Sequence, residues 1–234
     1  MKRLLLTTMT VLLLLGAGVA WSGNYEDGVA ASERGDYATA LRLWRPLAEK
    51  GLAAAQNDLG VIYLKGHGVA HDDAEAEKWF RLAATQGFAE AQLNLGAMYA
   101  EGLAVAQDYG EAAEWFRMAA EHGNAKAQFN LGLIYMSGSG VAQNDAQAVK
   151  WYRRSAAQGL AQAQYTLGLM YGDGRGVQQD YVRAYMWLDL GAKSGDIDSA
   201  KSRDLDATLM TPRQIADAQK MARDCLRRKF QGCQ

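Results

Sequence analysis

The segment LGVIYLKGHGVAHDDAEAEKWF, residues 59–80, places glycines beside apolar residues and ends on an aromatic pair. Closely similar segments follow at residues 95–116, 131–152 and 167–188. Each copy lies 36 residues after the previous one, with no insertion. Self-similarity at a fixed period of about 20 to 50 residues is typical of solenoid and propeller proteins. The chain is therefore predicted to be a repeat protein.

Two apolar stripes with helical spacing decide what each unit is made of. The members of each stripe fall at i, i+4, i+7 and i+8, which is the pattern of an amphipathic helix with one buried face. The first stripe consists of Ala55, Leu59, Ile62 and Tyr63, and the second of Ala76, Phe80, Ala83 and Ala84. Each unit is therefore predicted to be a pair of helices.

The residues between the two helices are typical of a turn followed by a helix start. Gly66 and Gly68 can take positive φ, and Asp72 followed by Glu75 forms a capping-box pattern. Gly60 costs about 1 kcal/mol in a helix relative to Ala. Because this glycine recurs in every copy, we expect the two helices to pack too closely for a methyl group.

These repeats resemble the Sel1-like repeat family, which is related to the tetratricopeptide repeats. The shared pattern is A-Q-x-x-L-G-x-x-Y-x-x-G-x-G-V-x-x-D-x-x-x-A-x-x-W-[FY]-x-x-A-A-x-x-G, and four copies span about residues 52–195. The copies depart from it at single positions: Ala104, Asn144, Ser155 and Gly191. The resemblance implies an all-α fold, an α/α solenoid (superhelix) of αα-hairpins, and a function as an adaptor.

The repeat register predicts how the whole chain is divided. A degenerate hairpin of the tetratricopeptide or Sel1-like kind precedes the four regular repeats, and capping helices follow them. The predicted segments are a signal peptide at 1–20, the degenerate hairpin at 22–51, repeats at 52–87, 88–123, 124–159 and 160–195, and C-terminal capping helices at 196–234.

The N-terminus has the composition of a secretory signal. Lys2 and Arg3 precede an apolar run, and small residues end it at Ala20. The alternative is a membrane anchor, for which the run has little length to spare. We expect cleavage before Trp21, no membrane span in the mature protein, and a periplasmic or secreted location.

Composition and motifs argue against several classes of function. The formal net charge of −1 offers no basic field for nucleic acid. No phosphate-binding loop, nucleophile elbow or His-Glu-x-x-His motif is present, so we predict no enzyme and no cofactor. His67 and His71 near Asp72 and Asp73 could bind a metal, but without a second ligand pair they are better read as solvated loop residues, and no metal site is predicted.

Two cysteines, Cys225 and Cys233, are the only ones in the chain. An even number of cysteines in an exported protein indicates a disulfide. On one uninterrupted helix their Cα atoms would lie about 12 Å apart, beyond the roughly 7 Å limit for a bridge. We therefore expect the helix to end near Lys229 or Phe230 and the tail to fold back. The alternative is two unpaired thiols.

Another apolar stripe, on a different face of the first helix of each repeat, offers a candidate binding surface. Leu93, Phe129 and Tyr165 occupy the same position of successive repeats. They either pack on the next repeat or line a concave groove that accepts a peptide or helix. We call these three residues the apolar ladder.

The sequence as a whole favours a non-enzymatic scaffold of the cell envelope that binds a protein segment. The alternative is a cell-wall protein that binds peptidoglycan or β-lactams, or a hydrolase. Its candidate acids near the loops are Glu101, Asp173 and Asp180. However, the resemblance implies a disulfide in each repeat for the family members that are linked to the cell wall. The repeats here contain no cysteine. Two carboxylates converging in one pocket would favour hydrolysis.

Overall fold

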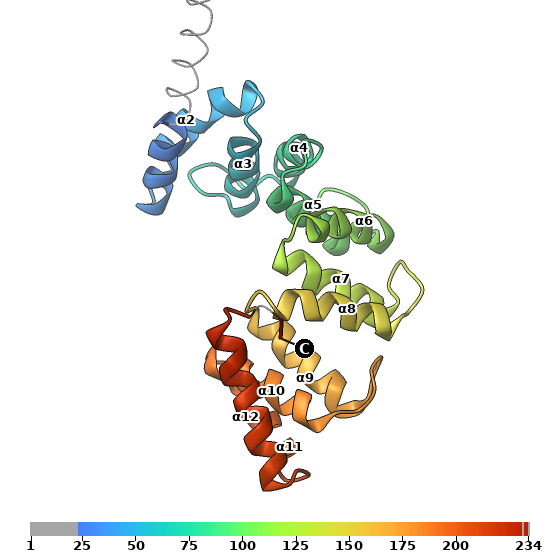
Figure 1. Ribbon diagram of the computed structural model, residues 1–234. Coiled ribbons are helices and arrows are strands. Elements are labelled where there is room, and N and C mark those ends of the chain that lie inside the picture. Colours follow the sequence, from blue (N-terminus) through green and yellow to red (C-terminus); the bar gives the residue numbers. More distant parts are fainter. Residues whose placement is uncertain (1–22, 231, 234) are drawn as a thin grey trace, which may run out of the picture. The chain divides into compact units, whose positions relative to one another are not determined.

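The computed structural model describes residues 23–230, 232 and 233. The predicted signal peptide, residues 1–20, lies outside these residues. The described residues form helices and turns and contain no strand (Figure 1). A helix at residues 23–33 comes first. It is followed by α2 (Tyr37–Glu49), α3 (Ala53–Lys65), α4 (Asp73–Ala84), α5 (Ala89–Glu101), α6 (Tyr109–Glu121), α7 (Ala125–Ser137), α8 (Asp145–Ala156), α9 (Ala161–Asp173), α10 (Tyr181–Lys193), α11 (Ile197–Ala207) and α12 (Pro212–Arg227).

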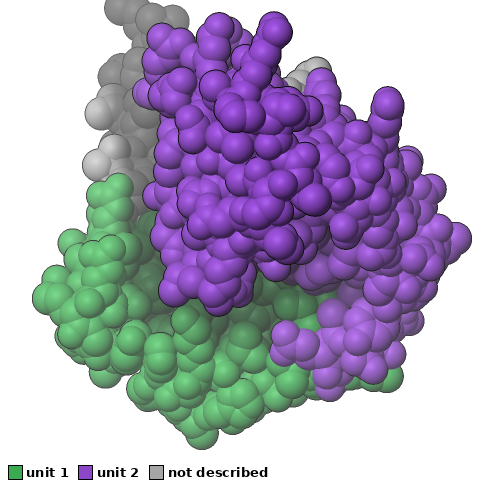
Figure 2. All heavy atoms as spheres, turned by 90° about the horizontal axis from the view of Figure 1, so that it is seen from below, with its two compact units in different colours: residues 1–98, 103–106 green, residues 99–102, 107–234 purple. Residues whose placement is uncertain are grey.

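The chain divides into two compact units, coloured separately in Figure 2. Unit 1 comprises the described residues up to Met98 together with residues 103–106, and unit 2 comprises residues 99–102 and the described residues from Gln107 onward. None of the described helices is long and apolar enough to cross a membrane.

Unit 1 is built around a core between its first helices. Helix α3 packs on both α2 and α4. Leu59 is fully buried and Trp44 nearly so, and both belong to one apolar cluster. Gly28, on the helix at residues 23–33, lies against the Trp44 ring so closely that a Cβ there would collide with it. The degenerate N-terminal hairpin thus contributes to the same core as the regular repeats.

Unit 2 has a larger core, built from consecutive helix pairs. Helices α7, α8, α9 and α10 each pack on the next helix in the chain, and α12 packs on α10. Tyr152 on α8 and Trp187 on α10 are completely buried in one apolar cluster. Residues at the aromatic-pair positions that end the repeat segments therefore lie in this core.

The helical glycines lie where two helices touch, as the sequence predicted. A Cβ built on Gly60 would lie 2.6 Å from the Phe80 ring, and one on Gly132 would lie 2.6 Å from the Tyr152 ring. At Gly168 the same atom would lie 2.7 Å from Leu188. Real Cβ atoms do not approach other atoms this closely, so the recurrent glycine is a packing requirement.

The predicted N-caps are present, but the second half of the predicted capping box is not, because the backbone N–H of Asp72 donates to the Tyr63 carbonyl at 3.1 Å and not to Glu75. The side chains of Asp72, Asp108 and Asn144 accept hydrogen bonds from backbone N–H groups of the helices that follow. Asp180, whose repeat lacks Glu or Gln three residues later, accepts from the Arg183 backbone N–H at 2.9 Å and also pairs with the Arg183 guanidinium. The Arg183 guanidinium donates to the capping carboxylate, and the Asp180 backbone N–H donates to the Tyr171 carbonyl at 2.9 Å.

Ala104 is strained because it occupies a glycine position. Its φ is +58°, where Gly68, Gly140 and Gly176 at the matching positions have φ of +73°, +71° and +71°. We expect Ala104→Gly to raise the free energy of unfolding by about 0.5–1 kcal/mol, since relief of left-handed strain exceeds the added freedom of the unfolded chain. Urea denaturation measures this change.

The matched control for Ala104→Gly is Gly140→Ala, for which the opposite sign is expected. A Cβ at Gly140 would collide with the backbone of Tyr109 and Gly110. If Ala104→Gly left stability unchanged, the strain assigned to Ala104 would be wrong.

The C-terminal helix has a clear start and ends close to the predicted position. Thr211 and Gln214 form a capping box at its start. The helix ends at Arg227, close to the expected Lys229 or Phe230, because these two residues have φ of +49° and +65°. This left-handed turn reverses the chain, and Phe230 packs against the core of unit 2.

Candidate functional site

The three residues of the apolar ladder are all half-buried. Leu93 lies on the part of α5 that belongs to unit 1, while Phe129 on α7 and Tyr165 on α9 belong to unit 2. The Phe129 ring lies 5.5 Å from the Tyr152 ring, centroid to centroid, and packs on the core. Phe129 therefore has one side against its own repeat, and the groove interpretation stays a prediction.

The acids proposed for a hydrolase do not gather in either of the two cavities described below. Asp180 caps α10, and Glu101 is exposed at the end of α5. Burial raises the pKa of the Asp206 carboxyl on α11, and the nearby charge of Asp173 raises it further. The sequence analysis missed this carboxylate pair because Asp206 lies outside the repeats.

His67 differs from the expected solvated loop residue. It is half-buried, and its ring stacks on Tyr37 with 4.3 Å between centroids. His71 is exposed, with Nδ1 2.8 Å from the Leu64 carbonyl oxygen and Nε2 3.1 Å from Asp73. Among the described residues, no group of three or more His, Cys, Asp or Glu side chains is arranged to hold a metal ion.

A cavity of about 170 Å³ lies within unit 1. It mixes aromatic and apolar walls with one acidic and two basic side chains. The residues that line it are Ser32, Tyr37, Trp44, Asp58, Val61, Ile62, Lys65 and His67. We call it the unit 1 cavity.

Asp58 is the acid of the unit 1 cavity. Its Oδ2 accepts a hydrogen bond from the Tyr25 hydroxyl at 2.8 Å, and its Oδ1 accepts one from Asn57 Nδ2 at 3.2 Å. Burial raises the pKa of the Asp58 carboxyl, although these two hydrogen bonds act in the opposite direction. The cavity therefore holds a carboxylate that the fold has partly removed from water.

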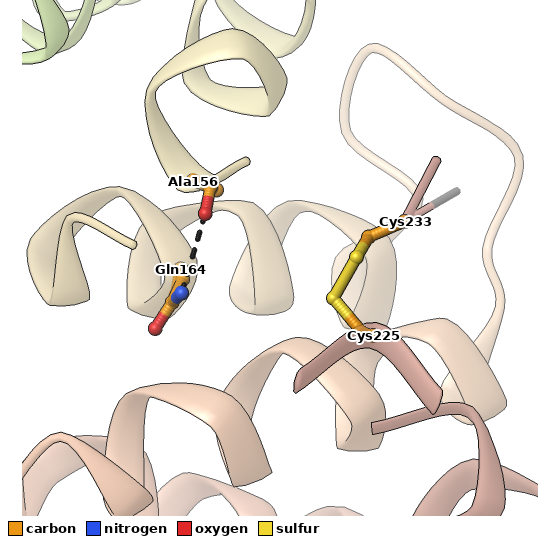
Figure 3. The surroundings of a disulfide bond; sticks show 4 residues. All are labelled: Ala156, Gln164, Cys225 and Cys233. Carbon is orange, nitrogen blue, oxygen red and sulfur yellow. Dashed lines mark hydrogen bonds between the residues drawn. A yellow bond between two sulfur atoms is a disulfide. The ribbon is translucent and has the colours of Figure 1, made fainter. Parts of the chain in front are cut away.

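A buried glutamine links each repeat to the preceding helix. Gln56 Nε2 donates to the Ala48 carbonyl at 2.9 Å. Gln164 Nε2 donates to the Ala156 carbonyl at 3.2 Å, and this bond is drawn in Figure 3. Gln92 and Gln128 do the same in the repeats between them. The glutamine belongs to the A-Q pair of the repeat pattern, and its recurrence indicates a structural role. The carbonyl to which it donates could not be deduced from the sequence.

An arginine-tyrosine hydrogen bond also recurs between neighbouring helices. Three pairs, each 18 residues apart, have donor–acceptor distances of 2.9, 3.4 and 2.7 Å: Arg45–Tyr63, Arg117–Tyr135 and Arg153–Tyr171. The sequence analysis used the tyrosines and overlooked the arginines, although these also recur every 36 residues. Both columns therefore link neighbouring helices through side-chain hydrogen bonds.

The structure brings Cys225 and Cys233 together, with 5.4 Å between their Cα atoms and the sulfur atoms joined (Figure 3). Both residues are buried. A second cavity, of about 160 Å³, adjoins them and is lined by Met186, Met221, Asp224, Cys225, Arg228, Gly232 and Cys233.

Comparisons with solved structures identify similar proteins. A protective antigen of uropathogenic Escherichia coli with an SLR fold is 36% identical over 89% of this chain, with a TM-score of 0.78. This chain covers 46% of the length of that antigen. A Sel1 repeat protein of Oxalobacter formigenes is 36% identical over 75% of this chain and 72% of its own, with a TM-score of 0.70.

A putative Sel1 repeat protein of Klebsiella pneumoniae shares the fold. It is 23% identical over 80% of this chain and 93% of its own, with a TM-score of 0.53. No curated protein matches the chain.

The family profile gives the same result along the sequence. Five segments match the Sel1 repeat: residues 15–52, 53–88, 89–124, 125–160 and 161–196. These segments cover most of the chain, and their helices are the consecutive pairs seen in the structure. The chain therefore belongs to the Sel1 repeat family, and its fold is the all-α, α/α solenoid of that family.

Proposed function

We propose that this protein is a non-enzymatic scaffold that binds a protein segment through the apolar ladder. Sel1 repeats commonly mediate protein–protein interaction and are typically non-catalytic. The observation that carries the proposal is that Leu93, Phe129 and Tyr165, at one repeat position, all remain half-buried. Apolar side chains on the first helices of successive repeats suit a peptide or helical partner.

The proposed location is the periplasm or the cell exterior. The N-terminal sequence supports this location because it has the pattern of a cleaved signal. The paired cysteines at the C-terminus support it as well, because disulfides persist in oxidising compartments.

A cell-wall hydrolase is the weaker proposal. Glycoside hydrolysis commonly uses two carboxylates flanking the scissile bond. Among the described residues, Asp58 is the only acidic residue that lines the unit 1 cavity, and Asp224 is the only one that lines the cavity near the cysteines. Neither cavity therefore has the pair of acids that this mechanism requires.

The test of the scaffold proposal is the Phe129→Glu variant in a crosslinking pull-down from the native envelope. We expect the crosslinked partner to be lost while helix content stays unchanged. Because Phe129 is only half-buried, the free energy of unfolding should fall by about 1–2 kcal/mol. Circular dichroism and thermal melts measure both quantities.

Leu205→Glu is the matched control, since Leu205 on α11 is 68% exposed and lies outside the apolar ladder. It should retain the partner and the melting temperature. A large fall in the melting temperature of Phe129→Glu, with partner capture intact in the fraction that stays folded, would refute the groove interpretation.

A further inference from the structure

The polar residues of the unit 1 cavity are not required by the repeat. At the position of Asp58 the later copies have Asn94, Asn130 and Thr166. The position of Lys65 is filled by Glu101, Ser137 and Asp173, and that of His67 by Leu103, Ser139 and Arg175. All four copies form the same helix pair with different residues here, so packing alone does not select this set.

Asp58 lacks a cationic partner among the described residues. Its two hydrogen-bond donors, Tyr25 and Asn57, are neutral, and no described lysine, arginine or histidine forms an ion pair with it. An ionised carboxylate has about four lone-pair sites, of which two are used here. A partly buried carboxylate without a cation is costly, and a bound cation would offset that cost.

The remaining walls of the unit 1 cavity suit an alkyl chain that ends in a charge. Tyr37 and Trp44 supply aromatic surface, and Val61 and Ile62 supply apolar surface. Methylene groups pack on such walls, and aromatic faces also attract cations. The volume of about 170 Å³ exceeds the roughly 10–15 Å³ that one water molecule needs.

Lys65 does not neutralise Asp58. It follows Asp58 by seven residues on α3, which places its Cα about 10 Å further along the helix axis. Lys65 and His67 therefore form a basic end of the cavity, and Asp58 with the Tyr25 hydroxyl forms an acidic end. A ligand ammonium group is attracted to the second of these ends.

We propose that the unit 1 cavity binds a lysine side chain of the partner segment, with its ammonium group on the Asp58 carboxylate and its methylene chain against the aromatic and apolar walls. The inference rests on the proposed function, because the lysine belongs to the protein that the scaffold binds. It adds a charged contact in unit 1 to the apolar ladder.

The test is a nuclear magnetic resonance titration of the mature chain with a lysine blocked at both its α-amino and carboxyl groups. The probe signal is the indole N–H of Trp44, which donates to the Tyr25 carbonyl at 3.1 Å beside the cavity. We expect a saturable shift of this signal. The Asp58→Asn variant should bind the blocked lysine at least about tenfold more weakly, because a charge-assisted contact is lost.

Asp58→Asn is expected to fold, because asparagine occupies the same position at Asn94 and Asn130 and its carbonyl can still accept from Tyr25. The matched ligand is the same blocked lysine acetylated on Nζ, which is neutral and should give no saturable shift. An equal shift in the variant, an equal shift with the acetylated ligand, or no shift in the wild-type chain would each overturn the proposal. This titration uses no partner protein, so its failure is distinct from failure of the pull-down with Phe129→Glu.

Discussion

Gly132→Ala is expected to lower the free energy of unfolding by about 2 kcal/mol, even though alanine is the better helix former. The new Cβ would lie 2.6 Å from the ring of Tyr152, which is completely buried on α8. A buried ring in a packed core has no space to move, and overpacking of this kind costs about 1–3 kcal/mol. Thermal and urea denaturation measure the loss.

Gly172→Ala is the control, because Gly172 lies inside a helix of the same unit without a close neighbour. The nearest atom to its added Cβ would be an Asp206 carboxylate oxygen at 3.5 Å, an ordinary contact distance. Stability should be unchanged or rise by up to about 1 kcal/mol, from helix propensity alone. If both variants changed stability in the same direction, close packing would not be the reason for the recurrent glycine.

The sequence predicted the fold well because periodic patterns determine it. The four regular repeats follow one another at a step of 36 residues. Each has a helix cap like Asp72 and a glycine like Gly60, so four copies supply four observations of one structure. Asp72 and Asp180 cap their helices as expected, and Gly60 and Gly132 lie in close helix contacts. Local rules of capping and packing therefore agree with the repeat as a whole.

The candidate sites were predicted less well because they depend on residues that do not recur. The unit 1 cavity joins residues from the helix at 23–33, α2, α3 and the following loop, including His67, which was expected in solvent. In the sequence, Asp58 cannot be told apart from the aspartates of the surface. Only the structure shows that Tyr25 and Asn57 donate hydrogen bonds to it. Non-repeated contacts between helices leave no periodic signal in the sequence.

The end of the C-terminal helix illustrates the same limit. The spacing of Cys225 and Cys233 predicted that the helix must end between them, and it does. The helix ends at Arg227, close to the expected Lys229 or Phe230, and the packing of Phe230 against the core helps decide where the chain reverses. That contact is tertiary and could not be read from the local sequence.

Removal of the crosslink between Cys225 and Cys233 is expected to cost about 2–3 kcal/mol, with the loss concentrated at the C-terminus. The bridge closes a loop with a sequence separation of 8, for which the chain-entropy estimate is about 2.5 kcal/mol. Cys233→Ser removes the bridge and leaves Cys225 on α12 in place. Hydrogen exchange should then become faster in α12, which packs on α10, while α7 and α8 keep their protection.

Intact-mass measurement of the exported protein tests the premise of that prediction. The mass should correspond to a chain that begins at Trp21 and should rise by two hydrogen atoms on reduction. An intact N-terminus would contradict export with cleavage, and a mass unaffected by reductant would show that the thiols are unpaired. In that second case Cys233→Ser should leave α12 as protected as in the wild-type chain, because the turn at Lys229 and Phe230 would then be held by packing of Phe230 alone.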